Sequence, residues 1–287
     1  MNLDNCPVCT CTLQKGHTAW HFVCKKCKYA CSSLLPAFHD EQAYDAIDSD
    51  LREIGLFSLR KKNFDQLFGE IISNKASGAS LLEIGSAHGW FLEIAKQQYH
   101  ILGIEPERKM VEYAVNLGLP IRHGFFPEVL QPDERFDIIV FNDVFEHISN
   151  VKESLKVCWA HLNKGGLLVL NLPNSRGVIY MLSKMMIKLG FPYFFERMWQ
   201  KDLPSPHLHY FEHTNLSLLL KNCGFTEIAF GYLEVFHFQG LKERIMACKN
   251  NPFYAKIFAY AAAVVLYPLR FLSKDIMYLI VQKDGSL

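Results

Sequence analysis

Two pairs of cysteines near the start of the chain have the spacing of metal ligands. Cys6 and Cys9 form one C-x-x-C pair, Cys24 and Cys27 form a second, and 14 residues separate the two pairs. Each pair can form a tight turn that presents two thiolates, and two such turns can surround one tetrahedral zinc ion. Because a full set of thiolates leaves zinc no open coordination position, the spacing predicts a structural Zn²⁺ site rather than a catalytic one.

A glycine-containing turn farther along the chain has the layout of a nucleotide-type cofactor site. Residues 81–91 combine an apolar run, a turn with Gly85 and Gly89, and the start of a helix. A second apolar run ends in Glu105, 22 residues after Glu83. Glycine lets the backbone approach a ligand closely, and an acid at the end of the neighbouring strand can accept hydrogen bonds from two ribose hydroxyls.

Acidic and histidine side chains follow the apolar run 136–142, and another histidine lies on a later loop. His147 stands close to Asp143 and Glu146 in the sequence. One interpretation makes His147 a base or a substrate hydrogen-bond partner, a second makes the acid–histidine pair a weak divalent-metal site, and a third is local packing. His209 lies on a proline-containing loop, where a histidine titrates near neutral pH, so it is the preferred base.

The elements that must position these side chains can be read from the hydropathy pattern. Short apolar runs alternate with segments of helical periodicity, which favours an α/β fold with a parallel sheet covered on both faces. The predicted strands are 80–84, 101–104, 121–125, 136–142, 167–172 and 276–281. The predicted helices are 40–73, 88–98, 107–117 and 151–162. Such a sheet binds ligands at the carboxyl ends of its strands, where the candidate residues stand.

The turn pattern E-x-G-x-x-x-G, formed by Glu83, Gly85 and Gly89, resembles motif I of the class I S-adenosylmethionine (SAM) methyltransferases. Ala87 stands where that family often has glycine, and Trp90 occupies a position that a dinucleotide-binding turn gives to glycine. Further segments resemble the family's motifs in the same order, at 136–139, 162–166, 222–225 and 276–281. The resemblance implies a Rossmann-like, seven-stranded SAM-methyltransferase sheet whose last strand is antiparallel.

The resemblance also implies which residues bind SAM. Glu105 would hold the ribose, Phe125 would stack on the adenine, and Asn142 would lie beside the methionine end. The full expected cofactor set is Glu83, Gly85, Ser86, Ala87, Gly89, Glu105, Phe125 and Asn142. Residues 142–148 and 206–211 are similar to the ubiquinone-biosynthesis O-methyltransferase type, and the chain as a whole resembles bacterial methyltransferases that carry an N-terminal zinc segment.

These patterns divide the chain into parts. We expect a zinc ribbon in residues 1–36, a helical cap in 37–75 and a SAM-dependent methyltransferase domain in 76–287. Two apolar insertions interrupt the last part, a substrate lid at 176–212 and a second insertion at 236–273.

The apolar run at 255–272, within the second insertion, leaves three interpretations open. It is too short to cross a bilayer, which needs about 20 residues. Flanking lysines and arginines would suit a peripheral contact with the inner face of the membrane. A buried helix and a dimer contact are the other two interpretations, and the sequence leaves the oligomeric state open.

Composition narrows the classes of function. The 287-residue chain has a net charge of +1, which argues against broad binding of nucleic acid. No signal peptide is recognised, and 6 of the 9 cysteines fall within the first 31 residues, which favours a metal site in the reducing cytoplasm. We expect methyl transfer from SAM to a small-molecule acceptor: a sugar, a surface-polysaccharide precursor or a quinone- or phenol-like compound, with or without a lipid anchor. The alternatives are an RNA methyltransferase that grips RNA with the ribbon and a catalytically inactive SAM-binding scaffold.

Overall fold

The structure is a computed structural model of the chain, and it contains one large and one small β-sheet. It describes residues 3–37, 49–235 and 274–284, together with single positions between 236 and 273. The elements, in chain order, are β1 (Gln14–Lys15), β2 (His21–Val23), β3 (Ala30–Ser32), α2 (Ser49–Asn74), β4 (Ser80–Ile84), α3 (Trp90–Ala95), β5 (His100–Glu105), α4 (Arg108–Asn116), β6 (Ile121–His123), β7 (Phe136–Asn142), the 3₁₀ helix η1 (Phe145–His147), α5 (Val151–His161), β8 (Leu162–Pro173), α6 (Val178–Lys188), α7 (Pro192–Met198), β9 (His209–Tyr210), α8 (His213–Asn222), β10 (Phe225–Leu233) and β11 (Ile276–Lys283).

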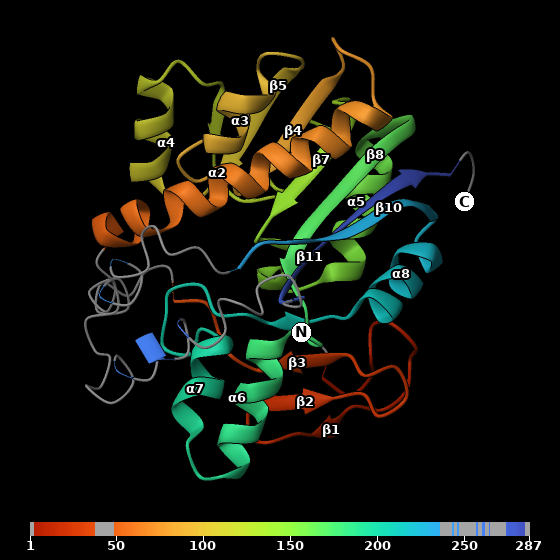
Figure 1. The fold of residues 1–287 in the computed structure, drawn as a ribbon. Coiled ribbons are helices and arrows are strands. Elements are labelled where there is room, and N and C mark those ends of the chain that lie inside the picture. Colours follow the sequence, from red (N-terminus) through yellow and green to blue (C-terminus); the bar gives the residue numbers. More distant parts are fainter. Residues whose placement is uncertain are drawn as a thin grey trace.

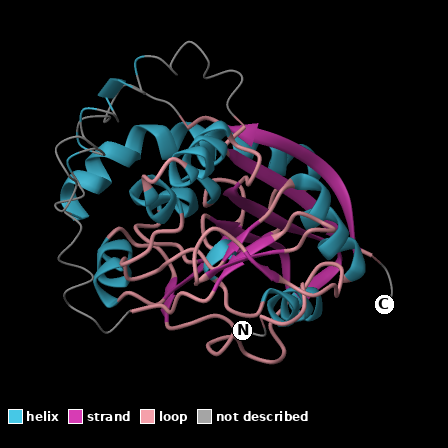
Figure 2. Ribbon diagram, turned by 90° about the horizontal axis from the view of Figure 1, so that it is seen from below, coloured by secondary structure: helices cyan, strands magenta, loops and turns pink. Residues whose placement is uncertain are grey.

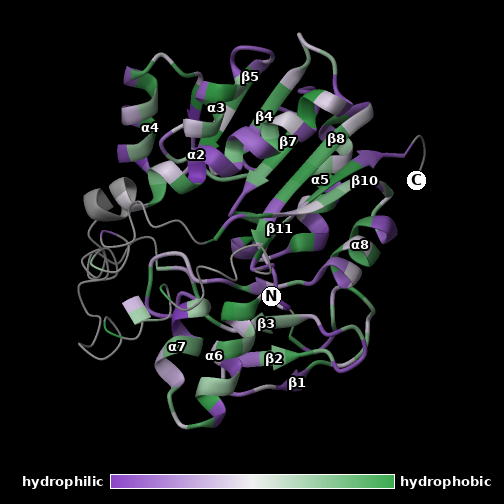
Figure 3. Cartoon of the chain, in the orientation of Figure 1, coloured by the Kyte–Doolittle hydropathy of each residue, from purple (hydrophilic) through white to green (hydrophobic). Residues whose placement is uncertain are grey.

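The large sheet has seven strands in the order β10-β11-β8-β7-β4-β5-β6 (Figure 1). Strands β8, β7, β4, β5 and β6 run parallel to one another, whereas β11 pairs antiparallel with both β8 and β10. Helices lie on both sides of the strands (Figure 2). The central strands are largely hydrophobic (Figure 3), as a parallel sheet buried on both faces requires. The prediction of a Rossmann-like, seven-stranded sheet is confirmed, and the carboxyl ends of β4, β5 and β7 meet at one edge.

Several element bounds differ from the predicted ones, and a glycine and a register shift explain two of the differences. The predicted strand 121–125 ends at His123, and the predicted helix 88–98 ends at Ala95. The part of the predicted helix 40–73 before Ser49 lies outside the described residues. The predicted strands 80–84 and 136–142 coincide with β4 and β7. The helix predicted from residue 88 begins only at Trp90, because Gly89 holds a left-handed backbone with φ 75° immediately before it. Strand β8 starts at Leu162, before its predicted start at 167, because Leu162 pairs with Phe136 and the ladder then shifts register.

The small sheet combines distant parts of the chain. Three of its strands, β1 to β3, come from the N-terminal segment, and the fourth, β9, lies near the end of the insertion 176–212, which follows β8. Strand β9 pairs antiparallel with β3, with Ala30 opposite Tyr210 and Cys31 opposite His209. The ribbon sheet is therefore completed by a strand that lies some 180 residues away in the sequence.

The insertion at 176–212 packs against the ribbon. Tyr180, Phe195 and Trp199, from α6, α7 and the residue after α7, form a buried cluster with Ala30 and Tyr210 of the small sheet. Figure 1 shows α6 and α7 beside the strands of that sheet, below the large sheet. The role of this insertion as a substrate lid stays a prediction.

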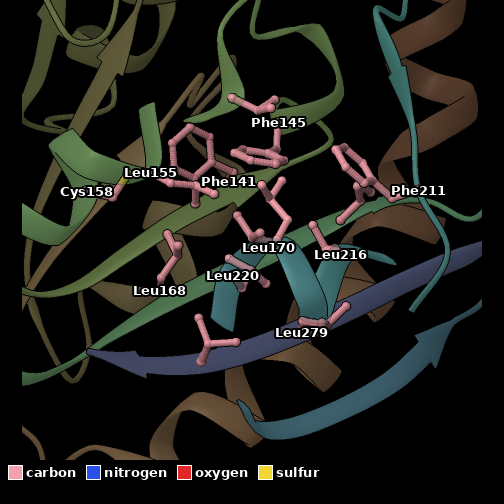
Figure 4. Packing of buried hydrophobic residues seen from close by; sticks show 14 of the residues in the cluster. Phe141, Phe145, Leu155, Cys158, Leu168, Leu170, Phe211, Leu216, Leu220 and Leu279 are labelled. Atoms are coloured by element: carbon pink, nitrogen blue, oxygen red, sulfur yellow. The ribbon is translucent and has the colours of Figure 1, made fainter. Parts of the chain in front are cut away.

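One hydrophobic core joins the ribbon to the large sheet. Tyr29 of the ribbon packs on Phe211, with ring centroids 5.1 Å apart, and Phe211 packs on Phe145 at 6.0 Å. Phe145 in turn meets Phe141 of β7 edge to face at 5.7 Å. Figure 4 shows these phenylalanines among leucines of β8, α8 and β11. The buried cluster that includes Cys6 and Cys24 therefore continues without a break into the sheet.

The apolar run at 255–272 lies outside the described residues except for single positions, so its predicted membrane, core or dimer contact remains a prediction. Among the residues that are described, no helix has both the length and the apolar character that a bilayer span requires.

Candidate cofactor and catalytic site

The turn after β4 has a backbone that suits only very small side chains. Gly85 and Gly89 have φ values of +69° and +75°, in the left-handed region that favours glycine. A Cβ on Gly85 would lie 2.5 Å from Val144 Cγ2, and one on Gly89 would lie 2.3 Å from Leu119 Cδ1. Ala87 also has a positive φ, 44°, which is strained for a residue with a Cβ. The backbone conformation therefore favours glycine at 85 and 89, and the side chains of Val144 and Leu119 occupy the space that a Cβ would need.

Glu105, at the end of β5, is anchored to this turn. Its Oε2 accepts a hydrogen bond from the backbone N–H of Ala87 at 2.8 Å, and its Oε1 accepts one from the N–H of Glu107 at 2.8 Å. Burial raises the pKa of the Glu105 carboxyl, while these two donors act in the opposite direction. A carboxylate held on both sides still has lone pairs that can accept bonds from a ligand diol.

Glu83 and Asn142 bring polar atoms to the same region. Asn142 Nδ2 donates to Glu83 Oε1 at 2.7 Å. Within the part of the chain that the structure describes, Glu83 Oε2, Asn142 Oδ1 and Ser86 Oγ are buried without a hydrogen-bond partner. An unsatisfied buried polar atom costs about 1–3 kcal/mol, so these atoms mark a place for a ligand that forms hydrogen bonds with them. Burial raises the pKa of Glu83 to about 8.

A pocket opens above these groups, between the turn and α2. Its lining residues are Arg60, Phe64, Glu83, Gly85, Ser86, Ala87, His88, Trp90, Phe91 and Asn142. Arg60 was not among the predicted site residues. Its Nη2 lies 3.4 Å from Asp143 Oδ2, and both side chains are about a quarter exposed. Two lysines follow Arg60, and the sequence does not show which of the three basic residues reaches the site. The packing of α2 places Arg60 in the lining of the pocket.

Phe125 lies on the turn after β6, where the resemblance places an adenine contact. Its side chain is 47% exposed. The neighbouring Gly124 donates its N–H to the backbone carbonyl of Glu105 at 3.0 Å, which ties this turn to the end of β5. Phe125 therefore lies on a turn that is bonded to the end of β5, and its cofactor contact stays a prediction.

A second group of titratable side chains lies just beyond Asn142. Glu146 is 1% exposed, and its Oε1 lies 3.9 Å from Nε2 of His147 and 3.9 Å from Nε2 of His207. Burial, and then the charge of Asp143, hold the pKa of Glu146 well above its usual range. Ligand atoms of Glu146, His147 and His207 all lie within 4.8 Å of one another, so the group could also share a metal ion.

The hydrogen bond of His147 sets which of its nitrogens is basic. Its Nδ1 lies 2.9 Å from the carbonyl oxygen of Pro206. A carbonyl oxygen only accepts, so Nδ1 carries the proton and Nε2 is the basic nitrogen of the neutral ring. The same Nε2 lies 3.9 Å from Oε1 of Glu146. This geometry permits the predicted role of His147 as a base or a hydrogen-bond partner.

His209, the preferred base of the sequence analysis, lies elsewhere. Its ring is buried, 2% exposed, and its Nε2 meets the carbonyl oxygen of Ile148 at 2.7 Å. Nε2 therefore carries the proton, and Nδ1 accepts a hydrogen bond from the hydroxyl of Tyr29. Burial lowers the pKa of His209 to about 4. Both nitrogens of His209 are therefore hydrogen-bonded, and the residue links the ribbon to the core. His147 and His207 lie at the candidate site instead.

The four predicted zinc ligands converge. Cys6 Sγ lies 3.5 Å from Cys27 Sγ, Cys9 Sγ lies 3.4 Å from Cys24 Sγ, and all four sulfurs lie within 4.8 Å of one another. Tetrahedral zinc with Zn–S bonds of about 2.3 Å places its sulfurs roughly 3.8 Å apart, which this cluster fits. The two turns are alike, because Thr10 and Lys28, each directly after a C-x-x-C pair, have φ values of 61° and 64°.

Comparisons with known proteins agree with this geometry. A family model described as a methyltransferase domain matches residues 55–229, more than half of the chain. A ubiquinone biosynthesis O-methyltransferase from Paramagnetospirillum magneticum is 30% identical over 115 residues, which cover 37% of this chain and 46% of that protein. The chain thus spans less than half the length of the curated relatives it matches.

Solved structures show the same fold at low sequence identity. The cyclopropane synthase MmaA2 from Mycobacterium tuberculosis has a TM-score of 0.60 at 17% identity, covering 88% of this chain and 100% of that chain. A SAM-dependent methyltransferase from Archaeoglobus fulgidus has a TM-score of 0.53 at 16% identity, covering 79% of this chain and 97% of that chain. Together with the glycine turn, the anchored carboxylate and the seven-stranded sheet, the family match shows that this chain belongs to the methyltransferase-domain family of class I SAM-methyltransferase fold.

Proposed function

We propose that the protein transfers a methyl group from SAM to a hydroxyl of a small, phenol- or quinone-like acceptor. The observation that carries this proposal is the pair of neighbouring sites at one sheet edge: a glycine turn with buried unsatisfied acceptors, and directly beyond it the cluster of Glu146, His147 and His207. The names of the similar ubiquinone biosynthesis enzymes support the phenolic choice. Sugars and polysaccharide precursors are the competing acceptors.

Residues of the pocket, together with Glu105 beside it, would take the parts of SAM. The carboxylate of Glu105 would accept bonds from the ribose diol, and Glu83 Oε2 with Asn142 Oδ1 would accept bonds from the α-ammonium group. Arg60 would face the methionine carboxylate, since it lines the same pocket. SAM supplies an activated methyl group on a positively charged sulfur. The protein aligns the acceptor oxygen with that methyl group and excludes water.

The histidine cluster would handle the acceptor proton. A phenol must lose its proton for the oxygen to attack well, and His147 Nε2 is positioned as an acceptor by its bond to Pro206. Glu146, buried beside that nitrogen, would offset the positive charge that the ring gains. Zinc has no part in this step, because the four cysteine thiolates would fill its coordination sphere and give it a structural role.

The direct test is to incubate the protein with deuterated-methyl SAM, a small-molecule extract and, separately, catechol as a phenolic probe. We expect mass spectrometry to find a product heavier by one labelled methyl group. A label on sugars only would overturn the phenolic acceptor. Label on RNA only would favour an RNA methyltransferase, and absence of any labelled product despite SAM binding would favour an inactive scaffold.

The Glu105→Ala variant is expected to bind SAM at least roughly fivefold more weakly, because a charge-assisted hydrogen bond to the ribose, worth more than ~1 kcal/mol, is lost. Isothermal titration calorimetry with S-adenosylhomocysteine and SAM measures this. Glu112→Ala, which removes an exposed carboxylate from α4, is the matched control and should bind normally. Unchanged affinity in Glu105→Ala would show that the ribose assignment is wrong.

SAM affinity is also expected to depend on pH through Glu83. The pKa of this carboxyl is raised to about 8, so the empty protein holds it protonated at lower pH, and only the ionised form attracts an ammonium group. Affinity should therefore rise as pH increases, on the order of tenfold between pH 6.5 and 8.5. The stability of the empty protein should instead fall as pH rises from the ordinary value of 4.5 to about 8, because over that range the unfolded chain releases the Glu83 proton and the folded chain keeps it. Glu83→Gln should remove most of this pH dependence, and an equally steep profile in that variant would contradict the assignment.

A further inference from the structure

The ribbon and the candidate catalytic cluster hold the same short segment, residues 206–210, from opposite sides. On the ribbon side, the backbone N–H of Ser32 donates to the carbonyl of Leu208 at 3.0 Å. The hydroxyl of Ser32 donates to the carbonyl of His207 at 2.8 Å, and this bond is buried. The segment is thereby fixed to β3 directly before it enters β9.

On the other side, the same segment is bonded to the residues of η1. The N–H of Leu208 donates to the carbonyl of Glu146 at 2.8 Å, and His147 Nδ1 donates to the carbonyl of Pro206 at 2.9 Å. The rings of His147 and His207 meet edge to face with centroids 4.8 Å apart. His207 thus lies on a segment that is bonded to the ribbon, while its N–H donates to the carbonyl of Trp199 at 2.9 Å and its Nε2 lies 2.8 Å from Nε2 of Gln200.

Tyr29 provides a third connection, through a side chain. It is fully buried, and its hydroxyl donates to His209 Nδ1. His209 Nε2 in turn donates to the carbonyl of Ile148, directly after η1. We call these two hydrogen bonds the relay. It connects Tyr29, two residues after Cys27, to Ile148, the residue that follows η1. Helix η1 carries Glu146 and His147.

We propose that Tyr29 is a positioning residue of the methyl-transfer site. Through Tyr29, the zinc ribbon holds His207 and His147 in their positions beside Glu146. This inference rests on the proposed function. The cofactor turn is secured separately, by Glu105 and by backbone bonds to β5. Disturbing the relay should therefore slow the reaction of bound acceptor without weakening SAM binding, a separation that general destabilisation would not produce.

The test compares the Tyr29→Phe and wild-type full-length proteins with catechol as the acceptor probe. The variant loses only the hydroxyl and keeps the ring that packs on Phe211. We expect kcat to fall about tenfold, because small displacements of reacting groups carry large rate penalties. The KM for catechol and the Kd for SAM should change by less than about threefold. Zinc content should equal that of the wild type, and the fluorescence of Trp20 and Trp199, which lie at the ribbon interface, should be unchanged.

Tyr99→Phe is the matched control. Tyr99 is also buried, but its hydroxyl donates to the carbonyl of Lys75 at 2.9 Å, away from the cluster, so its loss should leave kcat unchanged. Ser32→Ala is an independent second variant that removes the side-chain bond to His207, and a similar loss of kcat is expected.

The outcomes separate the inference from the function on which it rests. A wild-type protein that methylates neither catechol nor any extract component overturns the proposed function and this inference together. An active wild type with normal kcat in both Tyr29→Phe and Ser32→Ala overturns the inference alone. Equal losses of kcat, SAM affinity and zinc in these variants would indicate unfolding of the ribbon and would also overturn a positioning role.

Discussion

Replacing Glu146 with glutamine is expected to lower kcat about 100-fold or more while leaving the Kd for SAM unchanged. Glu146 is buried between two imidazoles, and both Nε2 atoms lie 3.9 Å from the same carboxylate oxygen. Burial raises its pKa, and a positive charge on either ring would lower it again, so the ionised form becomes available when His147 takes up a proton. Glutamine has nearly the same shape and cannot ionise, so it removes the charge and little of the packing.

Steady-state kinetics with a labelled acceptor, together with calorimetry for SAM, measure this effect. Glu153→Gln is the matched control, because Glu153 is an exposed residue of α5 whose partner is Lys156. It should retain wild-type kcat. If Glu146→Gln also retained wild-type kcat, the cluster of Glu146, His147 and His207 would have no part in methyl transfer, and the acceptor would have to be activated elsewhere.

The second large effect is expected from the four cysteines of the candidate zinc site. Cys9→Ala should release the metal and lower the stability of the folded protein by at least about 3 kcal/mol, because structural zinc sites supply much of the folding free energy of small ribbons. The loss should not stay local, since the core that contains Cys6 and Cys24 continues through Tyr29 and Phe211 into the large sheet. Thermal unfolding followed by circular dichroism should therefore show a midpoint lower by on the order of 10 °C.

Metal analysis and thermal unfolding of Cys11→Ala provide the control. Cys11 lies near the cluster in sequence and is not one of the four converging thiols. Its removal should leave both the zinc content and the midpoint at wild-type values. Full zinc content in Cys9→Ala would show instead that another thiol replaces the ligand, or that the site has a different set of ligands.

The local parts of this molecule could be predicted because their causes are local. Two C-x-x-C pairs set the thiol geometry within a few residues, and the left-handed turn needs glycine at 85 and 89 for reasons of backbone sterics. Continuous apolar runs indicated strands β4 and β7 with their observed bounds. Glu105 could be placed beside the turn because the strands before each of them are parallel neighbours that end at the same edge of the sheet.

The choice between histidines could not be made in the same way. Loop position suggested His209, but burial and two hydrogen bonds decide what an imidazole can do, and both partners of His209 come from distant segments. Arg60 was missed for a related reason, because only the packing of α2 over the turn separates it from the neighbouring lysines.

By itself, then, the sequence determined the fold class, the cofactor turn and the cysteine cluster, each of which depends on residues close together in the chain. Only the tertiary structure decided that β9 completes the ribbon sheet, that one core joins ribbon and large sheet, and that Glu146 faces His207. These contacts join segments about 60 to 180 residues apart. Hydrophobic burial drives such pairing without direction, so the partner of each segment is settled only when the whole chain packs.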